Sequence, residues 1–389
     1  MTGHVQRPAH DRCPGVFDPH PAADGALARI RLVGGSLRSS AMETLARVAA
    51  DHGDGFIELT GRANVQLRGI TDVAAVADAL IAADLVPSTT HEKIRNIEVS
   101  ALTGRIGGRA DVREVAVALD LALRAEAALT SLSGRFLFGV DDGRGDILAR
   151  RPDVCAVARA DGRTDIVIDG TVVGSVADSA DVAPALVAVA TDMVELAGPR
   201  GAWRVRDLDE ASRERLLRSA ATRLTPPAET DGGAEPVGPA EAIAPIVGWF
   251  TQDDDRVLLG AVVEAARVPA RLAEFLAAIG APIVVTPNRE ILICDLTEGV
   301  AETVVRVLAP MGLIFDAASP WARVSCCVGA PGCANAHAAV RADLIAHIAS
   351  GAEITDRQHW VGCARGCGSP AGPHLRVEAG PDGYVRSAR

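Results

Sequence analysis

The sequence is poor in aromatic residues and in lysine. Aromatic residues make up 3% of the 389 residues, with a single tyrosine, and Lys93 is the only lysine. Scarce aromatics leave Ala, Val and Leu to fill the core, and they exclude general base-stacking platforms for nucleic acid. Nearly all positive charge therefore sits on arginine, the better bidentate partner for carboxylates.

An excess of positive charge and a long apolar run are also missing. The formal net charge of -11 at pH 7 disfavours broad attraction to nucleic acid or anionic membranes. The best apolar run, 182–196, is broken by Asp192 and Glu195 and falls short of the roughly 18 residues that a membrane span needs. The first residues are charged, with no apolar stretch behind them. We expect a cytoplasmic protein with no nucleic-acid partner and no membrane partner.

The chain is long enough for two or three folded units, and its sequence contains an internal repeat. Residues 27–85 show the hydrophobic periodicity of a strand, a helix, two strands and a helix, and residues 256–308 show the same order. Thr60–Leu67 aligns without a gap against Thr286–Ile293. The repeat predicts a pseudo-symmetric body.

The two copies differ in polar side chains. Arg62, Asn64 and Gln66 of the first copy have no polar equivalent set in the second. When one copy of a duplicated unit keeps the functional side chains, we expect a single site between the halves. Residues 166–173 carry a hairpin signal, because Asp-Gly stands at the turn between two apolar runs.

Four cysteines near the C-terminus carry the strongest chemical signal. Their pattern is C-x5-C from Cys327 to Cys333 and C-x3-C from Cys363 to Cys367. Structural zinc sites favour short spacings in both pairs, so the five-residue gap favours an iron-sulfur cluster. The glycines around these cysteines allow tight turns that aim backbone N–H groups at sulfur. Four buried core cysteines are a poor alternative, given the spacing and the glycines.

The other cysteines need separate interpretation. Cys326 precedes Cys327 and would give C-x6-C, so either could be the first ligand, although five intervening residues fit the usual pattern better. Cys155 and Cys294 lie in apolar runs typical of core strands. Cys13 lies beside Pro-Gly in a predicted loop and is ambiguous.

Taken together, the cysteine pattern, Thr60–Leu67 and the two repeats resemble the sulfite and nitrite reductase superfamily over nearly the whole chain. The resemblance implies an α+β fold with two ferredoxin-like half-repeats, each followed by a mixed α/β segment, clasping a tetrapyrrole. It also implies a [4Fe-4S] cluster on the four cysteines, with Cys367 bridging to the iron of siroheme where siroheme is bound.

The resemblance and a linker rich in proline, glycine and acid define the expected domains. They are an N-terminal extension (1–26), the first half-repeat (27–88), a mixed α/β domain (89–222), the linker (223–243), the second half-repeat (244–312) and a C-terminal cluster-binding segment (313–389).

Within the superfamily, the sequence is most similar to the precorrin-3B synthase family of aerobic cobalamin biosynthesis. The likeness rests on 12–15 with 24–31 and 34–35, on 134–136 with 141–143, and on 362–367. Sulfite reductases usually have two lysines that here correspond to Arg135 and Leu137. Loss of a cation at Leu137 is costly for reducing a small anion but tolerable when the substrate is the macrocycle.

A uroporphyrinoid carries eight carboxylates, and an acidic protein must collect arginine to bind it. Positions that match family binding motifs predict the tetrapyrrole-binding residues as Arg62, Asn64, Gln66, Arg95 and Arg135. For Arg68, Arg150 and Arg151, ordinary surface charge is an equally good interpretation.

The resemblance implies an oxygen-dependent hydroxylation of precorrin-3A at C20, with γ-lactone formation. The partners would be precorrin-3A, O₂ and an electron donor, ultimately reduced nicotinamide or ferredoxin, with the cluster relaying electrons. Oxygen activation needs an iron or an equivalent centre, and a mononuclear iron is one candidate, although no clear 2-His-1-carboxylate spacing appears. His20 and His359 are isolated, which favours structural or surface roles.

Two alternatives use the same residues differently. A siroheme-dependent sulfite or nitrite reductase would hold the tetrapyrrole as a fixed cofactor, and Leu137 argues against it. A non-catalytic iron-sulfur or zinc-binding scaffold would keep the cysteines without needing Arg62, Asn64 and Gln66.

Overall fold

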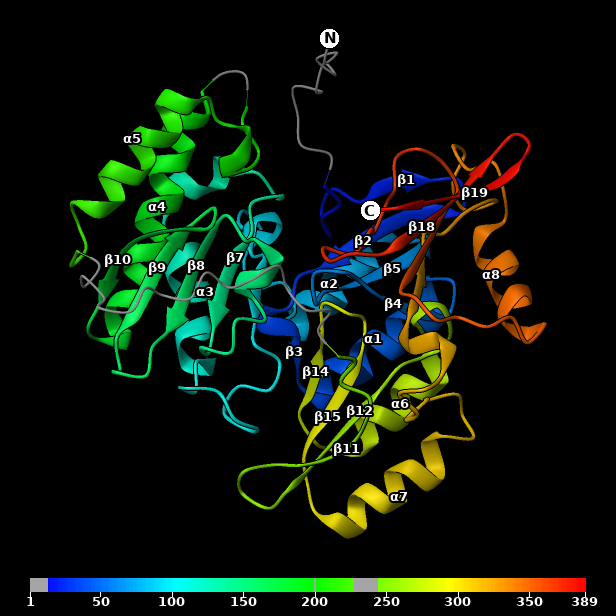
Figure 1. The fold of residues 1–389 in the computed structure, drawn as a ribbon. Coiled ribbons are helices and arrows are strands. Elements are labelled where there is room, and N and C mark those ends of the chain that lie inside the picture. The colour runs from blue at the N-terminus through cyan, green and yellow to red at the C-terminus, as the bar shows by residue number, and fades with distance from the viewer. Residues whose placement is uncertain (1–12, 199–200, 227–243) are drawn as a thin grey trace. The chain divides into compact units, whose positions relative to one another are not determined.

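The computed structural model describes residues 13–198, 201–226 and 244–389, which fall into two compact units (Figure 1). Unit 1 comprises Met1–Pro14, Ser88–Gly104 and Gly108–Gly238, and unit 2 comprises Gly15–Pro87, Arg105–Gly107 and Pro239–Arg389. Most of the expected linker, 223–243, and residues 1–12 of the expected N-terminal extension lie outside the described residues. The limits of the six expected domains stay a prediction.

The first half-repeat has the expected order of strand, helix, two strands and helix. Met42, Leu45 and Ala49 recur at helical spacing and form the buried face of the first helix, as the periodicity predicts. Asp72 begins the second helix, because its carboxylate accepts a hydrogen bond from the Ala75 N–H at 3.0 Å. The elements are β1 (His20–Ala22), β2 (Gly25–Ile30), β3 (Ser36–Leu37), α1 (Ser39–His52), β4 (Phe56–Leu59), β5 (Val65–Ile70) and α2 (Val73–Ala82).

The second half-repeat confirms the predicted duplication. Its elements are β11 (Gly248–Thr251), β12 (Val257–Ala261), β13 (Arg267–Pro269), α6 (Ala270–Ala278), β14 (Ile283–Val285), β15 (Ile291–Leu296) and α7 (Glu298–Leu308). The aligned turns share their backbone: Thr60 N–H donates to the Asn64 carbonyl at 2.9 Å, and Thr286 N–H donates to the Glu290 carbonyl at 3.0 Å. The third residue of each turn also has a positive φ, 53° at Ala63 and 67° at Arg289.

The two half-repeats exchange strands, so neither sheet is complete without the other copy. The sheet orders are β1-β2-β5-β4-β13 and β11-β12-β15-β14-β3. Helices α1 and α6 pack against each other, and one hydrophobic core spans both copies. Gly35 permits the exchange beside β3, because its φ is 71° and a Cβ there would lie 1.9 Å from the Val285 carbonyl oxygen. The exchange covers sheet edges that would otherwise be open.

Unit 1 contains a mixed sheet in the order β10-β9-β8-β7-β6. The predicted hairpin is confirmed, because β9 and β10 are antiparallel neighbours on either side of Asp169-Gly170. Helices α3 and α4 pack side by side against the sheet (Figure 1). The elements are β6 (Ile97–Val99), α3 (Arg113–Ala125), β7 (Phe138–Asp141), β8 (Val154–Ala158), β9 (Thr164–Ile168), β10 (Thr171–Val176), α4 (Val182–Ala197) and α5 (Glu210–Ala221).

The C-terminal segment of unit 2 repeats part of the unit 1 topology. Strands β16, β17 and β18 are parallel and β19 is antiparallel to β18, just as β6, β7 and β8 are parallel and β9 is antiparallel to β8. The internal repeat therefore extends beyond the half-repeats. The elements are β16 (Val324–Cys326), α8 (Val340–Ala349), β17 (Gln358–Val361), β18 (Leu375–Gly380) and β19 (Gly383–Ala388).

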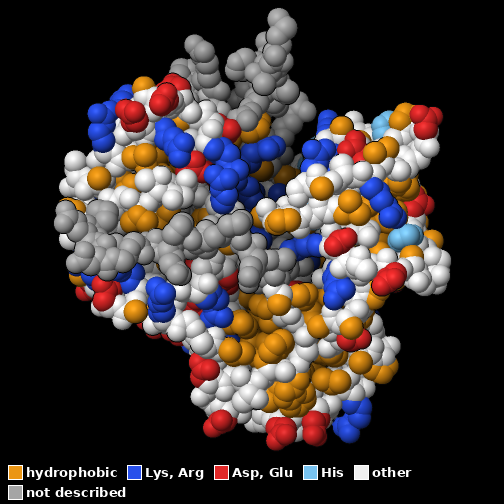
Figure 2. All heavy atoms as spheres, viewed as in Figure 1, with side chains coloured by type: hydrophobic (Ala, Val, Ile, Leu, Met, Phe, Trp, Pro, Cys, Tyr) orange, Lys and Arg blue, Asp and Glu red, His pale blue; other side chains and the backbone are white. Residues whose placement is uncertain are grey.

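Apolar side chains are not confined to the core. Figure 2 shows a group of them on the lower part of unit 2. Trp249 on β11 and both Val300 and Val307 on α7 are exposed. In the described part of the chain, no helix combines the length and the hydrophobicity required to cross a membrane.

Candidate cofactor and substrate site

The four predicted cysteine ligands lie on two loops that begin at neighbouring strand ends. Cys327 directly follows β16, and Cys363 comes two residues after β17. Because β16 and β17 are parallel, both loops leave the same edge of the sheet. Cys333 and Cys367 close the two loops, before α8 and β18 respectively.

The structure distinguishes Cys327 from its neighbour Cys326. The Cys327 N–H donates to the Trp360 carbonyl at 2.9 Å, and the Gly362 N–H donates to the Cys327 sulfur at 3.2 Å. Cys326 still belongs to β16, and burial raises the pKa of its thiol to about 11. Burial raises the pKa of the Cys327 thiol as well, but the N–H groups of Gly362 and Gly329 oppose that rise at its sulfur. This contrast supports Cys327 as the first ligand.

The sulfur atoms are near one another but not packed together. Burial raises the pKa of the Cys367 thiol, and the other three cysteines raise it further. Yet no three of these sulfur atoms belong to a group whose ligand atoms all lie within 4.8 Å, among the residues that the structure describes. A tetrahedral zinc with Zn–S bonds of about 2.3 Å needs sulfur atoms roughly 3.8 Å apart. The arrangement fits a cluster, in which each thiolate binds a different iron, better than a single zinc.

Arg68 anchors the loop between Cys327 and Cys333. Its guanidinium donates to both carboxylate oxygens of Asp24, at 3.0 and 2.8 Å, and to the Gly332 carbonyl at 3.1 Å. The side chain is buried, so ordinary surface charge, one of the two sequence interpretations, does not describe it. A bidentate ion pair of this kind fixes geometry as well as charge. Arg68 thus ties the first half-repeat to the first cysteine loop.

Three other cationic or histidine side chains hold the second cysteine loop by its carbonyl groups. Arg289 donates to the Gly368 carbonyl at 2.6 Å, and Arg376 donates to the Cys363 carbonyl at 3.2 Å. His359 Nε2 lies 3.0 Å from the Cys367 carbonyl oxygen. These contacts were not predicted, because nothing in the local sequence marks a side chain that binds a distant backbone carbonyl.

His359 has a structural environment, as one of the two sequence interpretations held. It is fully buried, and its Nδ1 lies 2.8 Å from the Ser325 hydroxyl. Burial, together with the positive charge of Arg289, lowers the pKa of His359 to about 3. A neutral ring can donate from Nε2 to the Cys367 carbonyl while Nδ1 accepts from Ser325.

Three of the predicted tetrapyrrole-binding residues lie on the β4–β5 hairpin of unit 2. Arg62 is half-buried in the turn, and Gln66 on β5 donates to Glu58 at 2.7 Å. Asn64 is buried, and its side-chain oxygen accepts a hydrogen bond from the Leu32 N–H at 2.8 Å. Its side-chain nitrogen Nδ2 is a buried donor with no partner among the described residues. Such an orphaned donor is costly and fits a site completed by a ligand's acceptor atom.

The other two predicted tetrapyrrole-binding residues belong to unit 1. Arg95 is buried, and its Nε lies 2.5 Å from an Asp120 carboxylate oxygen. Arg135 is exposed, with its guanidinium 4.4 Å from the centre of the Trp203 ring, a cation–π contact. Arg95 is thus committed to an ion pair, whereas Arg135 lies at the surface. Their role in binding stays a prediction.

The two remaining candidate arginines differ from each other. Arg150 is not ordinary surface charge, because its Nε lies 2.5 Å from an oxygen of the buried Glu98. Arg151 is exposed, and its carbonyl accepts hydrogen bonds from Arg204 and Arg206 at 3.2 Å. Its position agrees with the surface interpretation.

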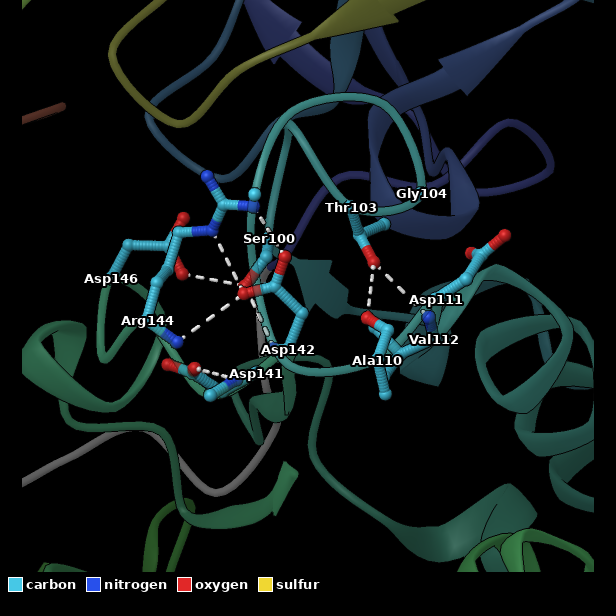
Figure 3. Close-up of polar contacts among 12 residues, drawn as sticks. Ser100, Thr103, Gly104, Ala110, Asp111, Val112, Asp141, Asp142, Arg144 and Asp146 are labelled. Carbon is cyan, nitrogen blue, oxygen red and sulfur yellow. Dashed lines mark hydrogen bonds and ion pairs between the residues drawn. The ribbon is translucent and has the colours of Figure 1, made fainter. Parts of the chain in front are cut away.

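Unit 1 contains a group of three acidic side chains that sequence analysis did not predict (Figure 3). Carboxylate oxygens of Asp141, Asp142 and Asp146 lie within 4.8 Å of one another. Asp142 pairs with Arg144 at 2.5 Å, and Asp146 accepts a hydrogen bond from the Ser100 hydroxyl at 2.6 Å. Burial, with help from the neighbouring carboxylates, raises the pKa of Asp146 to about 6.

This acidic group does not fit a mononuclear iron with two histidines and one carboxylate. No histidine is part of it. Asp141 already accepts four backbone hydrogen bonds, whose donors are the N–H groups of residues 143, 145, 147 and 148. Since the other two carboxylates also have protein donors, the group closes a loop rather than presenting open coordination positions.

Comparisons with known proteins agree with this architecture. Residues 20–83 match the family described as the nitrite/sulfite reductase ferredoxin-like half domain. A precorrin-3B synthase from a Sinorhizobium species is 27% identical over 403 residues, covering 98% of this chain and 83% of that protein. The NirA protein of Mycobacterium tuberculosis has the same fold, with a TM-score of 0.72 at 19% identity over 93% of this chain and 73% of that chain. In its duplicated fold, its half domain and its similarity along the whole chain, the protein resembles the sulfite and nitrite reductases.

Proposed function

We propose that this chain is an oxidoreductase that converts precorrin-3A to precorrin-3B in aerobic cobalamin biosynthesis. One atom of O₂ enters the macrocycle as the C20 hydroxyl, and a ring A acetate closes the γ-lactone. The other oxygen atom is reduced to water by two electrons and two protons. The electrons come ultimately from reduced nicotinamide or ferredoxin.

The observation that carries the proposal is the similarity to a precorrin-3B synthase along 98% of the chain. Leu137 adds a physical argument against reduction of a small anion. It is 4% exposed and provides no cation where the sulfite reductases usually have lysine. An oxyanion substrate needs such positive charge, but a macrocyclic substrate does not.

The donor set of the two cysteine loops fits an iron-sulfur cluster. Cys327, Cys333, Cys363 and Cys367 would hold a [4Fe-4S] cluster, which supplies one-electron transfer when bound. Arg68, Arg289 and Arg376 hold the loops by their carbonyls. The same cations would stabilise the negative charge of four thiolates. The Gly362 N–H would donate to the Cys327 thiolate once the cluster is bound.

The tetrapyrrole would be bound by Arg62, Asn64, Gln66, Arg95 and Arg135. Arg62 and Arg135 would pair with its carboxylates, and the buried Asn64 Nδ2 would donate its unused hydrogen bonds to a ligand oxygen. The side-chain bond from Gln66 to Glu58 would keep the hairpin rigid beside it. Substrate rather than siroheme would then occupy the site.

The proposal is tested by purifying the full chain without oxygen and recording its visible spectrum with iron and sulfide analysis. Precorrin-3A is then added in air, and the product is examined by mass spectrometry. We expect broad cluster absorption, no siroheme bands, and a product with one added oxygen atom. The variant Cys363→Ser should lose both the cluster and the turnover.

A different outcome would favour the alternative function. Intense siroheme bands, consumption of sulfite or nitrite, and unchanged precorrin-3A would identify a siroheme-dependent reductase with the same fold. Full activity of Cys363→Ser would exclude a redox role for the cluster.

A further inference from the structure

The second copy of the internal repeat contains a cavity of about 580 Å³ in unit 2. That volume lies within the range of roughly 300–1,000 Å³ typical of small-molecule sites. Residues from the β14–β15 turn, from the approaches to β16, β17 and β18, and from the end of β19 line it. None of them is a cysteine ligand, so the cavity is distinct from the two cysteine loops.

The position of the cavity within the repeat is informative. The gap-free alignment of the hairpin turns makes Arg62 equivalent to Asn288 and Asn64 equivalent to Glu290. Both Asn288 and Glu290 line the cavity.

Strand register extends the equivalence to the mixed sheets. Ile97 pairs with Phe138 across β6 and β7, as Val324 pairs with Gln358 across β16 and β17. Counting back from these pairs makes Arg95 equivalent to Ala322 and Arg135 equivalent to Thr355. Both Ala322 and Thr355 line the cavity as well. Four of the five predicted tetrapyrrole-binding positions therefore have equivalents around this one cavity.

None of the equivalent positions around the cavity is an arginine, but arginines at other positions bring positive charge to it. Arg323, Arg357 and Arg389 all line it. The side-chain oxygen of Asn288 accepts from Arg357 at 2.7 Å, which orients that guanidinium.

Of the acidic side chains that line the cavity, Glu290 is engaged by donors of the protein itself. The two Glu290 oxygens accept hydrogen bonds from the Ile246 N–H at 2.9 Å and the Thr286 hydroxyl at 2.5 Å. Glu290 is thereby committed to the protein, and Asp356 is the other acid of the lining. Three guanidinium groups in one cavity can each bind a carboxylate of a ligand, and planar guanidinium groups match carboxylates best.

We propose that this cavity is a second binding site, for a ligand bearing several carboxylates. The equivalent positions in the first copy are predicted to bind a tetrapyrrole. The ligand of the cavity would therefore be the edge of a uroporphyrinoid macrocycle, whose carboxylates surround the ring. That choice of macrocycle rests on the proposed function, whereas the cavity and its arginines do not. A small polycarboxylate shares the same chemistry and is the other source to be distinguished.

Binding of two probes to the full-length chain tests the proposal by isothermal titration calorimetry. The probes are uroporphyrin III, which carries eight carboxylates on a macrocycle, and citrate, a small tricarboxylate. The cavity variant is Arg323→Gln with Arg389→Gln, because both side chains are exposed and their loss should not impair folding. The matched control is Arg386→Gln, an exposed arginine of β19 that does not line the cavity.

For the native chain we expect two uroporphyrin molecules per chain. The cavity variant should bind one at unchanged affinity and the other at least tenfold more weakly, while Arg386→Gln should match the native chain. Citrate binding that is weakened tenfold in the cavity variant, without a change in uroporphyrin stoichiometry, would identify the ligand as a small polycarboxylate.

Unchanged isotherms for both probes in the cavity variant would overturn the second site. The variant Arg62→Ala separates this result from failure of the proposed function. If the native chain binds one uroporphyrin, and only the cavity variant weakens it, the second site stands and the predicted first site fails. If only Arg62→Ala weakens it, the predicted first site stands and the second site fails.

Discussion

Two pairs of loops have the same backbone hydrogen bonds but different side chains. One pair follows β6 and β7 in unit 1 and carries carboxylates, and the other follows β16 and β17 in unit 2 and carries thiols. Ser100 is equivalent to Cys327 by strand register. The Ser100 N–H donates to the Val140 carbonyl at 3.2 Å, just as the Cys327 N–H donates to the Trp360 carbonyl at 2.9 Å. The similarity extends to the side chains.

In unit 1 the Asp142 N–H donates to the Ser100 hydroxyl at 3.1 Å, and in unit 2 the Gly362 N–H donates to the Cys327 sulfur at 3.2 Å. Unit 1 then fills the space between its loops with carboxylates paired to arginine and to backbone N–H groups, whereas unit 2 brings thiols there. The duplicated backbone thus forms the same pocket in both units. Whether its ligand atoms are soft sulfur or hard oxygen decides which metal group the pocket can bind.

The largest expected effect separates Cys327 from Cys326. Cys327→Ser should abolish the cluster, because an uncharged hydroxyl is a poor ligand for iron in a thiolate site. Cys326→Ser should retain at least most of the iron and sulfide, since Cys326 belongs to β16 and lies outside the predicted ligand set. Iron and sulfide analysis with visible spectroscopy gives the result. Loss in Cys326→Ser with retention in Cys327→Ser would reverse the assignment.

The next effect concerns Arg68. Arg68→Ala removes a buried guanidinium and leaves the partly exposed Asp24 carboxylate and the Gly332 carbonyl without their donor. Loss of these charge-assisted hydrogen bonds, with only the arginine buried, should cost about 1–3 kcal/mol. Chemical denaturation followed by tryptophan fluorescence should show that loss of stability in unit 2, and the variant should release its cluster faster in air.

A matched control for Arg68 is Arg38→Ala. Arg38 and Asp84 form an ion pair at 3.6 Å in which both side chains are about two-thirds exposed. Exposed pairs contribute under about 1 kcal/mol. An equal loss of stability in both variants would contradict the anchoring role of Arg68.

Asp146 gives a pH-dependent prediction for unit 1. Its pKa of about 6 in the folded chain exceeds the ordinary 3.8, so between these values the folded state binds more protons than the unfolded state. Stability should therefore fall as pH rises from about 4 to 6, by on the order of 2 kcal/mol. Asp146→Asn keeps an acceptor for Ser100 but removes the titration, so its stability should vary less over that range in urea unfolding. An unchanged pH profile would show that Asp146 is already ionised.

The smallest effect tests whether the two loop pairs are interchangeable at one position. Ser100→Cys should change the free energy of unfolding by less than about 1 kcal/mol, because the equivalent Cys327 accepts the same backbone hydrogen bond. Ser100→Ala leaves the Asp142 N–H without that acceptor and should cost about 1–2 kcal/mol. Equal losses in the two variants would break the comparison at this position.

Local periodicity was enough to predict both half-repeats, because apolar side chains at positions such as Leu45 and Leu272 recur with the spacing of a helix that has one buried face. The four cysteine ligands could be proposed from spacing alone. The strand exchange could not, since β3 and β13 are too short to show which sheet they join. Nor could the role of Arg68, because its partner Gly332 is far away in the chain.

The sequence by itself determined the duplicated order of strands and helices and the residues able to bind iron, since both depend on side-chain type at short spacings. Tertiary structure alone decided which arginines became buried anchors and which stayed at the surface. Arg68 and Arg151 have the same intrinsic chemistry, and only burial against Asp24 and Gly332 makes the first one structural. Burial removes water as the competing partner, so the same guanidinium group changes from a solvated charge into a fixed hydrogen-bond donor.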